Sequence, residues 1–177
     1  MMEGARENMA YRNKLYIAFD GDYDMEYYNT FEMWRDNKNI DFNFHDAHDL
    51  NVARDSSLPE SIKVQLRERM RNSKTILLVV GEHTKYIRGY IPWEIGYARY
   101  LDLPIIVSNL NDRRRYDSNR CPSALGGGKG AVHVSFRMKI IRYALEHWPS
   151  FYHNNKPEVL EMVYHYPDDV YQTLGLL

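Results

Sequence analysis

Glu94 is the residue of this sequence best placed to do chemistry. It lies in the segment YIPWEI, residues 90–95, and Pro92 is typical of the first turn of a helix. We therefore expect a helix over Ile91–Leu101 with Glu94 in its first turn. One positioned carboxylate can stabilise a positive charge that develops in a transition state. The alternative is structural, because an acidic side chain in a first turn complements the helix dipole by ~0.3–1 kcal/mol. The residues alone leave both interpretations open.

Three aspartates, Asp20, Asp22 and Asp24, follow the first expected strand. Alternating carboxylates at a strand end can hold Mg²⁺. A receiver-type phosphoacceptor site also needs an aspartate at the end of the third strand, which here ends in Val80-Gly81. Turns and a helix cap therefore explain the three aspartates better than a metal site does, and we expect Asp24 to be the N-cap of the next helix.

A second polar cluster contains His45, Asp46, His48 and Asp49. Neighbours at a strand end point to opposite faces, and no third ligand follows at a supporting spacing. A solvated loop is therefore favoured over a metal site.

The glycine-rich stretch Gly126–Gly130 resembles a phosphate-binding loop superficially. Pro122 occupies the first position of that pattern, and Gly130 rather than Ser or Thr follows Lys129, so a P-loop is excluded. No GxGxxG follows the first strand, and a Rossmann dinucleotide site is unsupported. The run Arg113–Arg115 is interpreted as a solvated face, with contact to the phosphates of a ligand or partner as the alternative.

The elements that would position these residues alternate between strands and helices. The expected strands span Lys14–Phe19, Ile40–Asp46, Thr75–Val80, Pro104–Val107 and His133–Phe136. The expected helices span Asp24–Asp36, a segment that starts at Ser57, Ile91–Leu101, Arg137–Trp148 and Pro157–Tyr166. This alternation predicts an α/β fold with a parallel sheet covered on both faces. Ligands of such sheets bind outside the carboxyl ends of the strands.

Two patterns support these assignments most directly. The run TILLVV, residues 75–80, is typical of a strand buried on both faces. Ser57 and Glu60 form a capping-box pattern before a helix. That helix then places Ile62, Leu66 and Met70 on one face, and the helix before it does the same with Tyr27, Phe31 and Trp34.

Composition narrows the class of protein. The 177 residues suit one domain, and 44% hydrophobic with 27% charged residues is ordinary for a globular chain. With 23 basic and 24 acidic residues, the strongly basic footprint of a nucleic-acid binder is absent.

No apolar run approaches the ~20 residues of a membrane span, and residues 1–13 lack a signal-peptide core. The single cysteine, Cys121, has no indicated base partner and fits a reducing compartment. We expect a cytoplasmic protein.

Tyrosine is the unusual component, with 15 residues in the chain. Tyr143, Tyr152, Tyr164, Tyr166 and Tyr171 all lie in the last third. They mark a packing or subunit surface as readily as a ligand site.

Several segments, taken in order, resemble a TIR domain. They are KLYIAFD, the loop ending in ARDSS, SLPESIKVQLRERMRNS with TILLVVG, and TKYIRGYIPWEIGYA. Within that family they are most similar to the bacterial Thoeris anti-phage TIR proteins of the ThsB type, over about residues 14–110. The resemblance implies a flavodoxin-like, three-layer fold with a central, mainly parallel sheet. It suggests a polar tail at 1–13, a TIR-like domain at 14–150, and a helical C-terminal extension at 151–177 packed on the same domain.

The resemblance also implies an activity, cleavage of NAD⁺ at the nicotinamide–ribose bond. Glu94 matches the essential glutamate of catalytic members. Tyr90 stands where these members usually carry a tryptophan, and Trp93 adjoins the acid instead.

Other positions match the borders of the ligand cleft in such proteins. Phe19 and Asp20 match the end of the first strand, and Asp46 the end of the second. Ala47–Ser56 corresponds to the BB loop, which often mediates assembly.

The implied chemistry needs few groups. Nicotinamide leaves NAD⁺ as a neutral molecule, so the group that needs help is the oxocarbenium-like ribose. We expect NAD⁺ as substrate, no metal and no other cofactor, and no nucleic-acid or membrane partner. The expected product is a cyclic or conjugated ADP-ribose signal for a separate nucleotide-sensing effector, made by a homo-oligomer. The alternatives are a plain NAD⁺ hydrolase, a non-enzymatic TIR assembly module, and a protein that binds or transfers nucleosides.

Overall fold

One parallel sheet organises the computed structural model, which describes residues 15–38 and 59–177. Within this part of the chain five strands are hydrogen-bonded in the order β1-β2-β3-β4-β5. They are β1 (Leu15–Ala18), β2 (Thr75–Val80), β3 (Ile105–Asn109), β4 (Ala131–Ser135) and β5 (Tyr164–His165). Every pair of neighbours is parallel, which confirms the expected α/β class. The predicted strand Ile40–Asp46 and the predicted loop Ala47–Ser56 lie outside the described residues.

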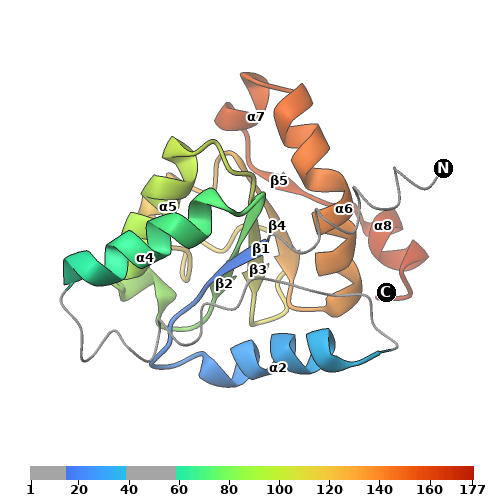
Figure 1. The fold of residues 1–177 in the computed structure, drawn as a ribbon. Coiled ribbons are helices and arrows are strands. Elements are labelled where there is room, and N and C mark those ends of the chain that lie inside the picture. The colour runs from blue at the N-terminus through green and yellow to red at the C-terminus, as the bar shows by residue number, and fades with distance from the viewer. Residues whose placement is uncertain (1–14, 39–58) are drawn as a thin grey trace.

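Helices cover both faces of this sheet (Figure 1). Those of the described residues are α2 (Met25–Asp36), α4 (Pro59–Arg71), α5 (Tyr90–Tyr100), α6 (Met138–Asn154), α7 (Glu158–Glu161) and α8 (Asp168–Thr173). Two 3₁₀ turns are η1 (Thr84–Tyr86) and η2 (Ser123–Leu125). One hydrophobic core lies between the sheet and α2, α6 and α8, and a second lies between the sheet and α4 and α5. The structure therefore has three layers.

The two cores follow from the alternation of side chains along each strand. In β1, Leu15 and Ile17 face α2 and α6, whereas Tyr16 and Ala18 face α4 and α5. Strand β2 repeats this pattern, and all six of its residues are buried. A strand with an apolar environment on both sides needs an unbroken apolar sequence, as residues 75–80 provide.

The expected stripe of α4 is confirmed, and that of α2 is shifted. Ile62, Leu66 and Met70 are fully buried. In α2, Phe31 is buried together with Tyr28, whereas Tyr27 and Trp34 are half-buried. Their rings pack around Phe136, which follows β4.

The C-terminal region differs from the sequence prediction. Helix α6 continues through Pro149 to Asn154, because Trp148 and Tyr152 are both buried in the core on that side. The helix predicted over Pro157–Tyr166 is wrong. Its residues form the four-residue α7 and then β5, which pairs with β4.

We predict that Leu66→Ala lowers the free energy of unfolding by about 2–5 kcal/mol, because it leaves a cavity under α4. Val64→Ala is the matched control on the same helix, since Val64 is 56% exposed, and its effect should stay within about 0.5 kcal/mol. Urea unfolding followed by circular dichroism measures both values. Similar losses in the two variants would contradict the burial of α4 against the sheet.

Candidate functional site

Polar side chains gather where the strands end. Because the strands are parallel, the segments that follow β1, β2 and β3 leave the same edge of the sheet. The segment after β1 carries Asp20 and Asp24, and the segment after β2 carries Gly81 and His83. Residues 110–122, between β3 and η2, reach the same edge, where Lys85 donates a hydrogen bond to the carbonyl of Ser118 at 2.8 Å.

Glu94 lies inside the protein rather than on its surface. It is 1% exposed, on the side of α5 that faces the sheet. The hydroxyl of Tyr16, on β1, donates a short hydrogen bond of 2.5 Å to its Oε1. A buried carboxylate is tolerated when donors satisfy its oxygens. The Tyr16 hydroxyl therefore holds Glu94 in place across the gap between α5 and the sheet.

The position of Glu94 in its helix differs from the expectation. Helix α5 begins at Tyr90, one residue earlier than predicted, so Glu94 follows the first turn. The stabilising effect of the helix dipole falls off within that turn. An acid that only complements a helix dipole is usually solvated, whereas Glu94 is buried and accepts a hydrogen bond from Tyr16. The structural explanation for an acid at this position is therefore weakened.

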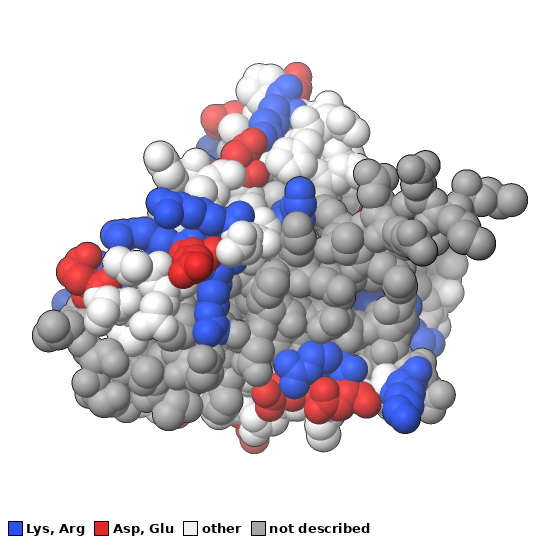
Figure 2. All heavy atoms as spheres, viewed as in Figure 1, with Lys and Arg blue, Asp and Glu red and all other residues white. Residues whose placement is uncertain are grey.

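The two aromatic residues beside Glu94 have different surroundings. Tyr90 is half-buried and packs at the border of the core under α4 and α5. Trp93 lies between the two helices, where the charged groups of Lys63 and Arg67 stand 5.8 and 5.7 Å from its ring centroid. Figure 2 shows Lys and Arg side chains gathered over α4, although the whole chain carries a net charge of −1. Two of these basic side chains, Lys63 and Arg67, are therefore engaged in cation–π contacts with Trp93.

The other predicted site residues are not all brought together. Phe19 is 2% exposed, and its ring stacks on Tyr28 at 4.6 Å between centroids. It therefore belongs to the core on the α2 side. Asp20 is 6% exposed, and its Oδ1 accepts a hydrogen bond from the amide of Asp22 at 3.0 Å. This is the turn expected from an aspartate. Asp46 lies outside the described residues.

Asp24 was expected to cap α2, and this expectation is wrong in part. It occupies the N-cap position, but its side chain makes no capping hydrogen bond. Instead its carboxylate, 5% exposed, lies against the backbone of Gly81. A Cβ on residue 81 would meet the Asp24 oxygens at 2.4 and 2.5 Å. A side chain at residue 81 would therefore displace this carboxylate.

Burial changes the acidity of Asp24. The loss of solvent, together with the charges of Asp20 and Glu26, raises its pKa to about 6. The positive charges of His83 and Arg120 act in the opposite direction. An acidic group at a strand end with a strongly shifted pKa is typical of functional sites.

Sequence reasoning missed Tyr16, His83 and Arg120. In the sequence, Tyr16 is one aromatic residue of an apolar strand, and its hydrogen-bond partner Glu94 is 78 positions away. His83 and Arg120 stand in polar loops that the sequence does not bring together. The position of all three near carboxylates follows from the sheet order.

The glycine-rich stretch Gly126–Gly130 has a structural role. Gly126, Gly127, Gly128 and Gly130 all have positive φ. The guanidinium of Arg99 donates to the carbonyls of Ala124, Leu125 and Lys129, which fixes this turn. The positive φ values explain why the stretch is rich in glycine.

The cysteine and the arginine run are also explained by packing and pairing. Cys121 is buried, and burial raises the pKa of its thiol to about 11, which opposes nucleophilic use. Arg113 pairs with Asp117, and Arg114 with Asp168 of α8. Residues 15–38 and 59–177 hold no group of three or more His, Cys, Asp or Glu side chains arranged for a metal. The histidines at 45 and 48 lie outside these ranges.

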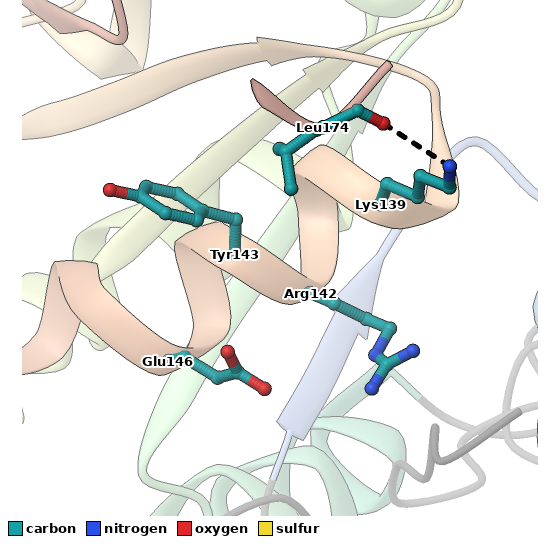
Figure 3. Close-up of a pocket in the computed structure, with 5 residues that line it drawn as sticks. All are labelled: Lys139, Arg142, Tyr143, Glu146 and Leu174. Atoms are coloured by element: carbon teal, nitrogen blue, oxygen red, sulfur yellow. Dashed lines mark hydrogen bonds between the residues drawn. The ribbon is translucent and has the colours of Figure 1, made fainter. Parts of the chain in front are cut away.

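A cavity of about 230 Å³ opens on the outer side of α6 (Figure 3). It is lined by Lys139, Arg142, Tyr143, Glu146 and Leu174. The Lys139 ammonium donates to the Leu174 carbonyl at 3.2 Å, joining α6 to the end of α8. Its mixed charges do not select one class of ligand. Among the described helices, none has the length and apolarity that crossing a membrane demands.

A protein-family model matches this chain. The family model described as Thoeris protein ThsB, TIR-like domain, matches residues 16–115, which is more than half of the chain. The matched span contains Tyr16, Asp24, Gly81 and Glu94. It ends before η2, so β4, β5 and helices α6 to α8 lie beyond it. The span agrees with residues 14–110, over which the sequence itself resembles this family.

We predict that Asp24→Asn stabilises the protein at neutral pH. The unfolded chain ionises this group near pH 4, whereas the folded protein keeps the proton to about pH 6. Folding therefore retains a proton, and stability is lost as the pH rises through this window. The variant should gain about 1–3 kcal/mol over the wild type above pH 7 and nothing below pH 4.

Urea unfolding of the two proteins at a series of pH values measures this difference. Asp22→Asn is the control, because Asp22 is exposed in the same segment. Because a surface substitution usually changes stability by less than about 0.5 kcal/mol, the stability of this variant should stay close to that of the wild type. An equal pH dependence for Asp24→Asn and the wild type would show that the carboxyl is not shifted.

Proposed function

This chain belongs to the Thoeris ThsB family of TIR-like domains, and we propose that it cleaves NAD⁺ at the nicotinamide–ribose bond with Glu94 as catalytic residue. The observation that carries the proposal is the buried carboxylate of Glu94, oriented by the Tyr16 hydroxyl at 2.5 Å. Within the described residues it combines deep burial, a position on the helix after β2, and a fixed orientation.

The proposed reaction needs one carboxylate and no metal. The bond between C1′ of the ribose and the nicotinamide nitrogen breaks, and its electron pair neutralises the pyridinium. The ribose is left with oxocarbenium character, which an ionised carboxylate stabilises electrostatically. Burial strengthens this interaction, because little water screens the two charges.

The nucleophile that captures the ribose determines the product. Water gives ADP-ribose and a proton. A hydroxyl or an adenine nitrogen of the same molecule gives a cyclic product, and another acceptor gives a conjugate. In keeping with the Thoeris family, we favour a cyclic or conjugated ADP-ribose that signals to a separate effector. Plain hydrolysis is the alternative product outcome.

The burial of Glu94 sets a condition on this activity. With 1% of its surface exposed, NAD⁺ reaches the carboxylate after neighbouring groups move. Activity is therefore coupled to a conformational step. A phage-derived trigger or self-assembly would supply the free energy for it.

We predict that Glu94→Gln lowers NAD⁺ consumption by roughly 10²-fold or more, because the amide carries no charge to stabilise the oxocarbenium. Mass spectrometry of NAD⁺ and its products, with purified protein and with cells under phage challenge, measures the rate and identifies the product. Glu68→Gln, an exposed glutamate of α4, is the control and should match the wild type.

NAD⁺ consumption by Glu94→Gln at the wild-type rate would remove Glu94 from the mechanism. A wild type that consumes no NAD⁺ in either setting would instead favour a non-enzymatic assembly module.

A second prediction concerns Tyr16 as a positioning residue. Tyr16→Phe keeps the buried ring and removes the hydroxyl that donates to Glu94. We expect kcat to fall roughly tenfold, the effect of losing one hydrogen bond to a charged group, with KM nearly unchanged. An unchanged kcat would assign Tyr16 a packing role alone.

A further inference from the structure

Two exposed rings meet above the ends of β1 and β2. Tyr23, from the segment after β1, lies 3.9 Å from His83, from the segment after β2, between ring centroids. Their planes differ by 30°, and Tyr23 is 61% exposed. Most of this aromatic pair is thus open to solvent, at the edge of the sheet where ligands of parallel sheets bind. Nucleobases stack favourably on such rings, whatever their sequence, because every base has a π-face.

Two carboxylates of the same segment have oxygens with unused hydrogen-bonding capacity. Asp20 and Asp24 are 6% and 5% exposed. In each of them Oδ2 is buried and has no hydrogen-bond partner among the described residues. A buried acceptor left in this state destabilises the fold, because it has lost its hydrogen bonds to water. Gly81 leaves room for one of them, since any Cβ there would collide with the Asp24 carboxylate.

Ser108 adds a third buried oxygen on this side of the sheet. Its Oγ is fully buried and has no hydrogen-bond partner in the described part of the chain. Ser108 is paired with Val79 in the register of β2 and β3, and Val79 faces the core under α2. Gly81 follows two residues later on the same face, so Ser108 and the Asp24 carboxylate belong to one side of the sheet edge.

The charges around Asp24 favour a ligand with neutral donors over a metal cation. Two carboxylates are fewer ligands than a protein site supplies to Ca²⁺. Arg120 adds positive charge close enough to lower the pKa of Asp24, and this charge opposes a cation. The guanidinium of Arg120 suits a phosphate next to the group that binds the carboxylates.

We propose that this edge binds the adenosine half of NAD⁺: Tyr23 and His83 stack on the base, and the buried aspartates accept hydrogen bonds from the ribose hydroxyls. The inference rests on the proposed function for the identity of the ligand. Vicinal hydroxyls supply two donors to the Oδ2 atoms of Asp20 and Asp24. Arg120 is then available to the phosphates that connect this half to the ribose cleaved at Glu94.

Calorimetry with AMP and ADP-ribose tests the subsite without catalysis. Tyr23→Ala should weaken both ligands roughly tenfold or more, and Tyr23→Phe should retain most of the affinity, because stacking needs the ring. Asp24→Asn should weaken them roughly tenfold, although the same substitution is expected to stabilise the fold. Tyr100→Ala is the control, since Tyr100 is 79% exposed in the last turn of α5, and should bind as the wild type does.

The hydroxyl contacts are tested with AMP and its 2′-deoxy and 3′-deoxy forms. The wild type should prefer AMP over at least one deoxy form, and Asp24→Asn should lose this preference. Wild-type protein that binds neither AMP nor ADP-ribose, or variants at Tyr23 and Asp24 that bind both as tightly as the wild type, would overturn the inference.

The two proposals can fail separately. NAD⁺ cleavage that depends on Glu94, with the KM of Asp24→Asn unchanged, would overturn the subsite and leave the proposed function. Binding of AMP that depends on Tyr23 and Asp24, in a protein that does not cleave NAD⁺ under any condition, would leave the subsite and overturn the proposed function.

Discussion

The sheet of this protein is covered on both faces, and this constraint decides where polar chemistry takes place. All residues of β1, β2, β3 and β4 are buried, and helices fill the layers on either side. A polar group within such a sheet costs free energy unless it is hydrogen-bonded. Carboxylates are therefore tolerated where strands end, as with Asp20, or where a neighbouring element supplies a donor, as with Glu94 and Tyr16.

Both candidate groups, Glu94 and Asp24, are unfavourable choices for stability alone. Asp24 retains a pKa of about 6 because it is buried beside another acid, and its place against Gly81 excludes any larger residue there. Functional sites commonly reduce the stability of a fold in this way. The two carboxylates also differ in the face of the sheet that they occupy. Glu94 lies on the α5 side and Asp24 on the α2 side.

The tyrosines of the last third find their explanation in packing. Tyr152 and Tyr171 are buried in the core under α6, with Tyr143, Tyr164 and Tyr166 partly buried around it. Their hydroxyls connect separate elements. Tyr171 accepts a hydrogen bond from the amide of Ser135 at the end of β4, and Tyr152 donates to Asp102 beyond α5. Tyrosine suits this region because its ring is apolar and its hydroxyl can still reach a polar partner.

The sequence by itself determined the alternation of strands and helices, the buried strand TILLVV, the stripe of α4 and the family. These features depend on local periodicity and on the order of motifs, which a single chain displays directly. Local patterns also pointed to Glu94, but they placed it in a first turn and gave Asp24 the role of a cap. Only the tertiary structure decided that a tyrosine 78 positions away holds Glu94, that Gly81 makes room for Asp24, and that Tyr23 meets His83. Such contacts join segments whose separation in sequence carries no signal, because the pairing order of parallel strands brings them to one edge.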